Sequence, residues 1–125
     1  RAAARAIRQA RVLTKEPPVE EARFVPEPSA DLSDDDHIDD FCRLHPRWSY
    51  DGTALVAQVK APTFLHGIDD GAAIAQVAEE MDHHPDIDIR WRNLTFRLST
   101  HSAHGVTGLD IALAERIDAI VDAAP

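Results

Sequence analysis

The sequence predicts an α+β domain: a four-stranded antiparallel sheet with three helices packed on one face, in the order α-β-β-α-β-β-α, preceded by an N-terminal extension. Two segments, at about 48–59 and 87–99, alternate apolar and polar residues as β-hairpins do. Three other segments repeat apolar residues at helical spacing and begin at capping residues. The 125 residues suit one domain, and 44% of them are apolar, which is enough for a packed core.

The first 30 residues are predicted to form an extension, and residues 31–125 the domain itself. From Arg1 to Lys15 the chain has five basic residues and no acidic one, whereas Glu16 to Asp40 holds ten acidic residues against one arginine. Prolines in the stretch up to Pro28 favour an extended linker. An ordered helix and a transit peptide both remain open for the basic part.

The first helix of the domain is expected after Asp31, with Ser33 as its cap and Asp34 to Asp36 in its first turn, where negative charge suits the helix dipole. Pro46 ends it. Its short apolar stripe is spaced by three and four residues: Ile38, Phe41, Cys42 and His45.

A hairpin and the longest helix follow. Asp51-Gly52 is expected to turn the chain between Trp48–Tyr50 and 55–59. Thr63 can then cap a helix that runs to about Met81. Its inner face is expected to consist of Phe64, Ile68, Ala75 and Ala78, together with Ile74, Val77 and Met81.

The second hairpin and the last helix complete the fold. Arg92-Asn93 is expected to be the hairpin turn, between strands whose apolar faces are Ile87, Ile89 and Trp91, then Leu94, Phe96 and Leu98. Thr107 opens the last helix. Its apolar stripe is predicted to be Ile111, Ala114, Ile117 and Val121, with Leu113 and Ile120 beside it.

The composition excludes several function classes. A net charge of -9 disfavours nucleic acid as a partner, because a phosphate backbone repels an acidic protein. No apolar stretch approaches the length of a membrane span. The single cysteine, Cys42, cannot form an internal disulfide and is expected to be a buried small residue. We therefore expect a soluble, cytoplasmic protein.

Four of the seven histidines fall between His83 and His104. His83 and His84 come just past the end of the long helix, and His101 lies where the last strand ends. One hairpin separates the two histidine segments. Because the two ends of a hairpin lie side by side, we expect the imidazoles to surround one cleft. Since histidine exchanges protons near neutral pH, the cluster predicts acid-base catalysis.

Other interpretations of these residues stay open. Adjacent histidines in a loop can be surface residues, and His101 with His104 and His83 or His84 could bind a metal with Glu79 or Asp82 nearby. Neither a His-Glu-x-x-His helix nor a cysteine cluster supports the metal site. Asp110, three residues after Thr107, can be a helix cap rather than a site residue. Glu79 can orient an imidazole or belong to a solvated face.

The spacing of these residues resembles the signature of the pterin-4a-carbinolamine dehydratases. The signature positions are Glu79, His83-His84-Pro85, Trp91, Thr100-His101 and the Gly-x-Thr-x-x-Asp run from Gly105 to Asp110. The resemblance covers about residues 32–121. Two positions depart from it: Ile87 stands where many members have an aromatic residue, and His104 where a small or variable residue is usual.

The resemblance implies the fold predicted above and dehydration of a 4a-hydroxytetrahydropterin to the quinonoid dihydropterin, which recycles the cofactor of aromatic amino-acid hydroxylases. Neither a metal nor a redox cofactor is implied, and a homodimer or homotetramer is expected. The implied catalytic residues are His83, His84, His101 and Asp110, with His84 as the main acid. The implied substrate-binding residues are Glu79, Pro85, Trp91 and Thr100.

The resemblance also implies an alternative function. Within this family one vertebrate member doubles as a dimerisation cofactor of a homeodomain transcription factor, and a degenerate relative is a RuBisCO assembly factor. A non-catalytic binding or assembly module therefore remains possible on the same fold. The complete set of implied catalytic residues favours the enzyme.

Overall fold

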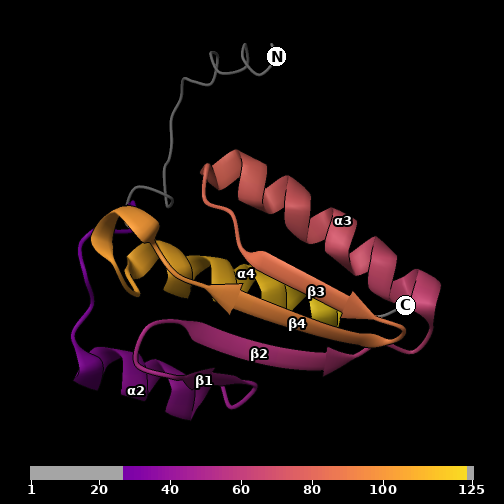
Figure 1. Ribbon diagram of the computed structural model, residues 1–125, viewed down its shortest axis with the longest axis horizontal. Coiled ribbons are helices and arrows are strands. Elements are labelled where there is room, and N and C mark those ends of the chain that lie inside the picture. Colours follow the sequence, from indigo (N-terminus) through magenta and orange to yellow (C-terminus); the bar gives the residue numbers. More distant parts are fainter. Residues whose placement is uncertain (1–26, 124–125) are drawn as a thin grey trace, which may run out of the picture.

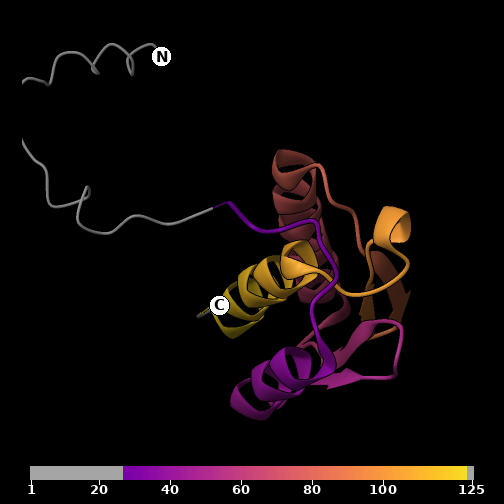
Figure 2. The ribbon, with the colours of Figure 1, turned by 90° about the vertical axis from the view of Figure 1, so that its left-hand side faces the viewer.

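Four strands and three α-helices succeed one another in residues 27–123, the part of the chain that the computed structural model describes. In chain order the elements are α2 (Asp35–Leu44), β1 (Trp48–Tyr50), β2 (Leu55–Lys60), α3 (Phe64–Met81), β3 (Asp86–Arg90), β4 (Asn93–Leu98), the 3-10 turn η1 (His101–Ala103) and α4 (Gly108–Asp122). The strands form one antiparallel sheet in the order β1-β2-β4-β3. The helices lie on one side of it (Figures 1 and 2). The predicted fold class is confirmed; the predictions for the first 26 residues lie outside the described part.

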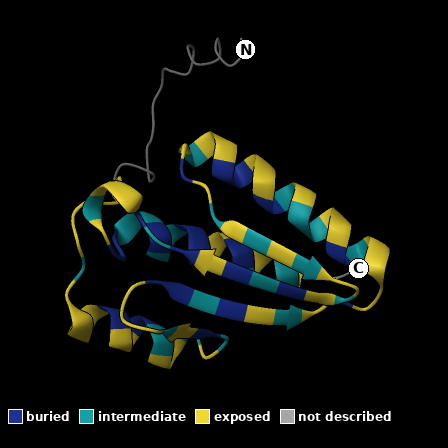
Figure 3. Ribbon diagram, in the orientation of Figure 1, coloured by how far each residue is buried: buried dark blue, intermediate teal, exposed yellow. Residues whose placement is uncertain are grey.

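The alternation of side chains along the central strands builds the core. In β4, Leu94, Phe96 and Leu98 are buried, and Leu55 and Ala57 of β2 lie beside them in the antiparallel register. The alternate residues of these strands face solvent or are half-buried, as the pattern along the ribbon shows (Figure 3). One face of the sheet is therefore apolar and covered by the helices, while the other is open.

Helix α3 begins where the sequence predicts, because the Thr63 side chain accepts the His66 N–H. The prediction of its inner face is partly wrong. Ile74, Val77 and Ala78 are buried, but Phe64, Ile68 and Ala75 are exposed. The helix has apolar residues on two faces, and the sheet and α4 cover one of them. Among residues 27–123, no helix is both long and apolar enough to cross a membrane.

Two local boundaries differ from the prediction. Asp34, not Ser33, caps α2: its side chain accepts the His37 N–H at 2.8 Å. Ser33 lies one residue earlier, where its N–H donates to the Val106 carbonyl. The second hairpin turns at Trp91 and Arg92, since Asn93 pairs with Arg90 and begins β4. Trp91 is thus outside the strand, 64% exposed, with a φ of 55°.

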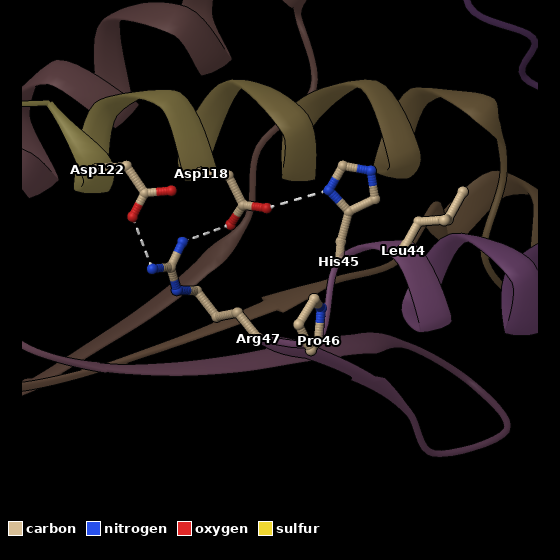
Figure 4. Close-up of a pocket in the computed structure, with 6 residues that line it drawn as sticks. All are labelled: Leu44, His45, Pro46, Arg47, Asp118 and Asp122. Atoms are coloured by element: carbon tan, nitrogen blue, oxygen red, sulfur yellow. Dashed lines mark hydrogen bonds and ion pairs between the residues drawn. The ribbon is translucent and has the colours of Figure 1, made fainter.

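Helix α4 is held at both ends. Thr107 and Asp110 form a capping box at its start, and its predicted apolar stripe lies buried or half-buried in the core. Near its end, Arg47 donates to Asp118 and Asp122, both at 2.8 Å (Figure 4). The Trp48 indole N–H also donates to Asp118, at 2.9 Å. These bonds tie α4 to the corner between α2 and β1.

Two glycines of α3 make a matched pair for testing how closely this helix packs on the sheet. A Cβ at Gly67 would lie 2.9 Å from Leu94 Cδ1 and 3.3 Å from Ala61 Cβ, and both neighbours are buried. Gly67→Val should therefore lower the free energy of unfolding by about 1–3 kcal/mol. Urea denaturation monitored by circular dichroism measures the change.

Gly71→Ala is the control for the glycine pair. A Cβ there would meet Ile89 Cδ1 at 3.6 Å, an ordinary contact. Because alanine favours the helix interior by about 1 kcal/mol over glycine, this variant should be as stable as the parent or more so. Equal destabilisation by both variants would contradict the close approach at Gly67.

Candidate active site

The doubled histidine is presented by the end of α3. Asp82 adopts the left-handed conformation, with a φ of 51°. Its N–H donates to the Glu79 carbonyl at 3.2 Å, and the His83 N–H donates to the Ala78 carbonyl at 3.0 Å. This Schellman geometry reverses the chain at once. It turns His83 into the protein, where it is 9% exposed, and leaves His84 exposed.

Asp110 lies at the centre of a buried hydrogen-bond network and is 0% exposed. Its Oδ1 bonds His83 Nε2 at 2.5 Å. Its Oδ2 accepts the Thr100 hydroxyl at 2.7 Å and the Thr107 N–H at 2.9 Å. The carboxylate is thus both the helix cap and the hydrogen-bond partner of an imidazole.

The directions of these bonds follow from the donors available. Thr100 gives its hydroxyl proton to Asp110, so the contact of 2.7 Å between the Thr100 and Thr107 hydroxyls needs Thr107 as donor. Thr107 Oγ1 in turn accepts the Leu109 N–H at 3.2 Å. An ionised Asp110 can only accept a hydrogen bond, so the tautomer of His83 that fits this network carries a proton on Nε2. The other ring nitrogen of His83, Nδ1, then lies outside the network.

His84 has a different environment. Its Nε2 lies 2.6 Å from Glu79 Oε2, and the side chains are 55% and 76% exposed. Glu79 therefore contacts an imidazole and also belongs to the exposed face of α3. An exposed pair of this kind holds its geometry less tightly than the buried pair does. The candidate site thus combines one buried imidazole with one exposed imidazole.

His101 and His104 lie on a short closed loop after β4. Backbone bonds join Thr100 and Gly105 in both directions, at 2.8 and 3.4 Å, and η1 lies between them. Both histidines are exposed, and His104 has a φ of 61°. Since His101 directly follows Thr100, the loop begins at the edge of the Asp110 network.

The pairing of β3 with β4 brings the two histidine segments to one end of the sheet. Asp86 is opposite Arg97, so residues that precede Asp86 run alongside the residues that follow Leu98. Pro85, half-buried, lies on this end as well. Trp91 does not, because it is at the hairpin turn beyond the far end of β3 (Figure 1).

The geometry bears on the predicted metal site and on the two threonines near Asp110. In residues 27–123 no three His, Cys, Asp or Glu side chains form a group that could hold a metal ion, so the alternative with His101 and His104 has no structural support. The Thr100 hydroxyl is bonded within the network. Sequence reasoning missed Thr107 as part of the site. The Thr-x-x-Asp spacing signals its cap but not its bond to Thr100.

Sequence comparison gives consistent matches. The family model described as pterin 4 alpha carbinolamine dehydratase matches residues 31–120. A protein of Mycolicibacterium smegmatis is 50% identical over 86 residues, 69% of this chain and 92% of its own. One of Mycobacteroides abscessus is 52% identical over 87 residues, 70% of this chain and 93% of its own. Both bear the name "Putative pterin-4-alpha-carbinolamine dehydratase".

Two solved structures are similar. A transcriptional coactivator/pterin dehydratase from Brucella melitensis is 31% identical, with a TM-score of 0.68, and the match covers 73% of this chain and 98% of that one. A pterin dehydratase-like protein described as a RuBisCO assembly factor of the alpha-carboxysome is 20% identical, with a TM-score of 0.53, and the match covers 62% and 92%. The second likeness concerns the fold alone.

The buried network predicts a large difference between two acidic side chains. Asp110→Ala removes the acceptor of three buried donors, so the free energy of unfolding should fall by about 3 kcal/mol. Glu79→Ala breaks only an exposed pair and should change it by less than about 1 kcal/mol. Urea denaturation of both variants tests this, and similar losses would contradict the central position of Asp110.

Proposed function

The chain belongs to the pterin-4a-carbinolamine dehydratase family, and on that premise we propose that it removes water from a 4a-hydroxytetrahydropterin to give the quinonoid dihydropterin. The observation that supports the proposal most is the pair of adjacent imidazoles, each bonded through Nε2 to a carboxylate: His83 to Asp110 and His84 to Glu79. The product would recycle the cofactor of an aromatic amino-acid hydroxylase. The single cysteine fits a reducing, cytoplasmic compartment.

The reaction needs two proton movements. The bond between C4a and its hydroxyl oxygen breaks as the oxygen receives a proton, and water departs with the bonding electron pair. A ring nitrogen loses its proton, and its electrons form the new double bond to C4a. An acid and a base on one site can therefore complete the reaction, and the proposal requires no metal or redox cofactor.

The two imidazoles are suited to different parts of this chemistry. We assign the proton donor to His84, because its exposed ring can reach a departing hydroxyl and pass the proton from solvent. His83, or His101 on the adjacent loop, would take the proton from the ring nitrogen. Asp110 and Glu79 would orient their imidazoles by accepting from Nε2, which leaves Nδ1 toward the substrate.

His84→Ala tests the assignment of the acid. The variant should remain folded, because the side chain is exposed, and should lose about 100-fold of the rate of quinonoid dihydropterin formation. The measurement is the absorbance of the product formed from a freshly generated 4a-hydroxytetrahydropterin. His37→Ala, which removes an exposed histidine of α2, is the control and should keep the parent rate. An unchanged rate in His84→Ala would contradict the assignment of His84 as the proton donor.

The competing proposal is a binding or assembly module on the same fold. The Brucella melitensis protein is described as both a transcriptional coactivator and a pterin dehydratase, and this description supports the binding module as a second candidate function. Both functions would use the same fold, but only the enzyme needs the bonded imidazoles. If the parent chain does not accelerate the dehydration at all, the binding module is the better proposal.

We also propose that the chain forms a homo-oligomer through the outer face of α3. Leu65 and Ile68 are 67% and 38% exposed there, and exposed Ala72 and Ala75 continue the face at spacings of three and four residues. This seam resembles the contact line of paired helices. Large side chains near the start of α3 and small ones further along would interdigitate in an antiparallel pair of α3 helices from two copies.

Leu65→Glu tests the oligomer. A charge within the apolar seam should shift the mass measured by multi-angle light scattering from a dimer or tetramer towards the monomer. Leu44→Glu is the matched control, because Leu44 is 72% exposed at the end of α2 and outside the seam. A parent chain that is monomeric at high concentration would exclude this interface.

A further inference from the structure

The segment that precedes α2 runs across the loop that leads into α4. The Ser33 N–H donates to the Val106 carbonyl at 2.9 Å, and Leu32 forms an antiparallel bridge with Thr107. Further back, the Ser29 carbonyl accepts the Leu109 N–H at 3.1 Å. Figure 2 shows this indigo segment passing beside the start of α4. We call residues 29–33 the strap; the predicted extension supplies its first two residues.

Two glycines allow the strap to come this close. A Cβ on Gly108 would lie 2.9 Å from the Ser29 nitrogen and 3.1 Å from its carbonyl oxygen. These are backbone atoms, so they could move away only if the strap itself moved. A Cβ on Gly105 would meet Leu32 Cδ2 at 2.9 Å, the flexible end of a side chain. The close approach of the strap therefore requires a glycine more strictly at Gly108 than at Gly105.

The residues that the strap holds are those that complete the Asp110 network. Thr107 supplies a backbone N–H to Asp110 and a hydroxyl to Thr100, and it lies between two strap contacts, at Val106 and Leu109. Asp110 follows Leu109 directly. A displacement of the strap would thus reach the carboxylate through one or two peptide units.

We propose that the strap positions Asp110 and, through it, the imidazole of His83. The chain of contacts is continuous: strap to the backbone of 106–109, that backbone to Asp110, and Asp110 to His83 Nε2. The residues of the strap do not touch the reacting atoms in this scheme; they are positioning residues. The catalytic part of this proposal rests on the proposed dehydratase function, whereas the structural part does not.

The experiment uses the full chain and two readouts. The first is the proton resonance of the His83 imidazole N–H in ¹⁵N-labelled protein, assigned by its loss in Asp110→Asn. The second is the split of dehydratase activity into kcat and KM. Gly108→Ala should move this resonance and speed its exchange with water, while kcat falls about tenfold at nearly constant KM.

A second variant and a control separate this effect from loss of folding. Alanine favours a helix over glycine, so Gly108→Ala should not weaken α4 itself. Leu32→Ala trims a side chain that is 61% exposed, so the fold should persist while the strap loosens, and both readouts should change in the same direction to a smaller extent. Leu44→Ala removes another exposed leucine away from the strap and should leave both readouts unchanged.

The outcomes are distinct. An unchanged imidazole resonance and kcat in folded Gly108→Ala and Leu32→Ala would overturn the positioning role. If Gly108→Ala does not fold, Leu32→Ala decides alone. If the parent chain has no dehydratase activity, the proposed function fails, and the imidazole resonance still decides whether the strap positions His83.

Discussion

The carboxylate of Asp110 is fully buried where three parts of the chain converge: the end of α3, the end of β4 and the start of α4. Burying such a charge costs several kcal/mol unless hydrogen-bond donors surround it. Each of the three parts supplies one donor: His83, Thr100 and the N–H of Thr107. The position of the candidate site therefore depends on how well the fold satisfies this one group.

The same network explains why adjacent histidines differ in character. The left-handed residue at Asp82 reverses the chain, so His83 turns toward Asp110 and His84 toward solvent and Glu79. A buried imidazole and an exposed one are thus adjacent in the chain. The acid and base chemistry proposed for this chain would use this difference between the two imidazoles.

Helix α3 shows how a single element serves several requirements. Gly67 lets it approach Leu94 of the sheet, and its last turn presents the histidines. Its outer face retains apolar residues that the sheet does not cover, including Leu65 and Ile68. The face that sequence periodicity alone assigns to the core is in part the face proposed for contact with a second copy.

The sequence by itself determined the order of the elements, the caps at Thr63 and Thr107 and the identity of the clustered histidines. These features depend on residues close together in the chain, whose periodicity and capping chemistry are local. Only the tertiary structure decided that the Thr100 hydroxyl bonds Asp110 and that Asp34, not Ser33, is the cap of α2. It also decided that Phe64 faces outward and that Trp91 lies far from the histidines. Each of these depends on which distant segment offers a partner or a covering surface, and no local pattern contains that information.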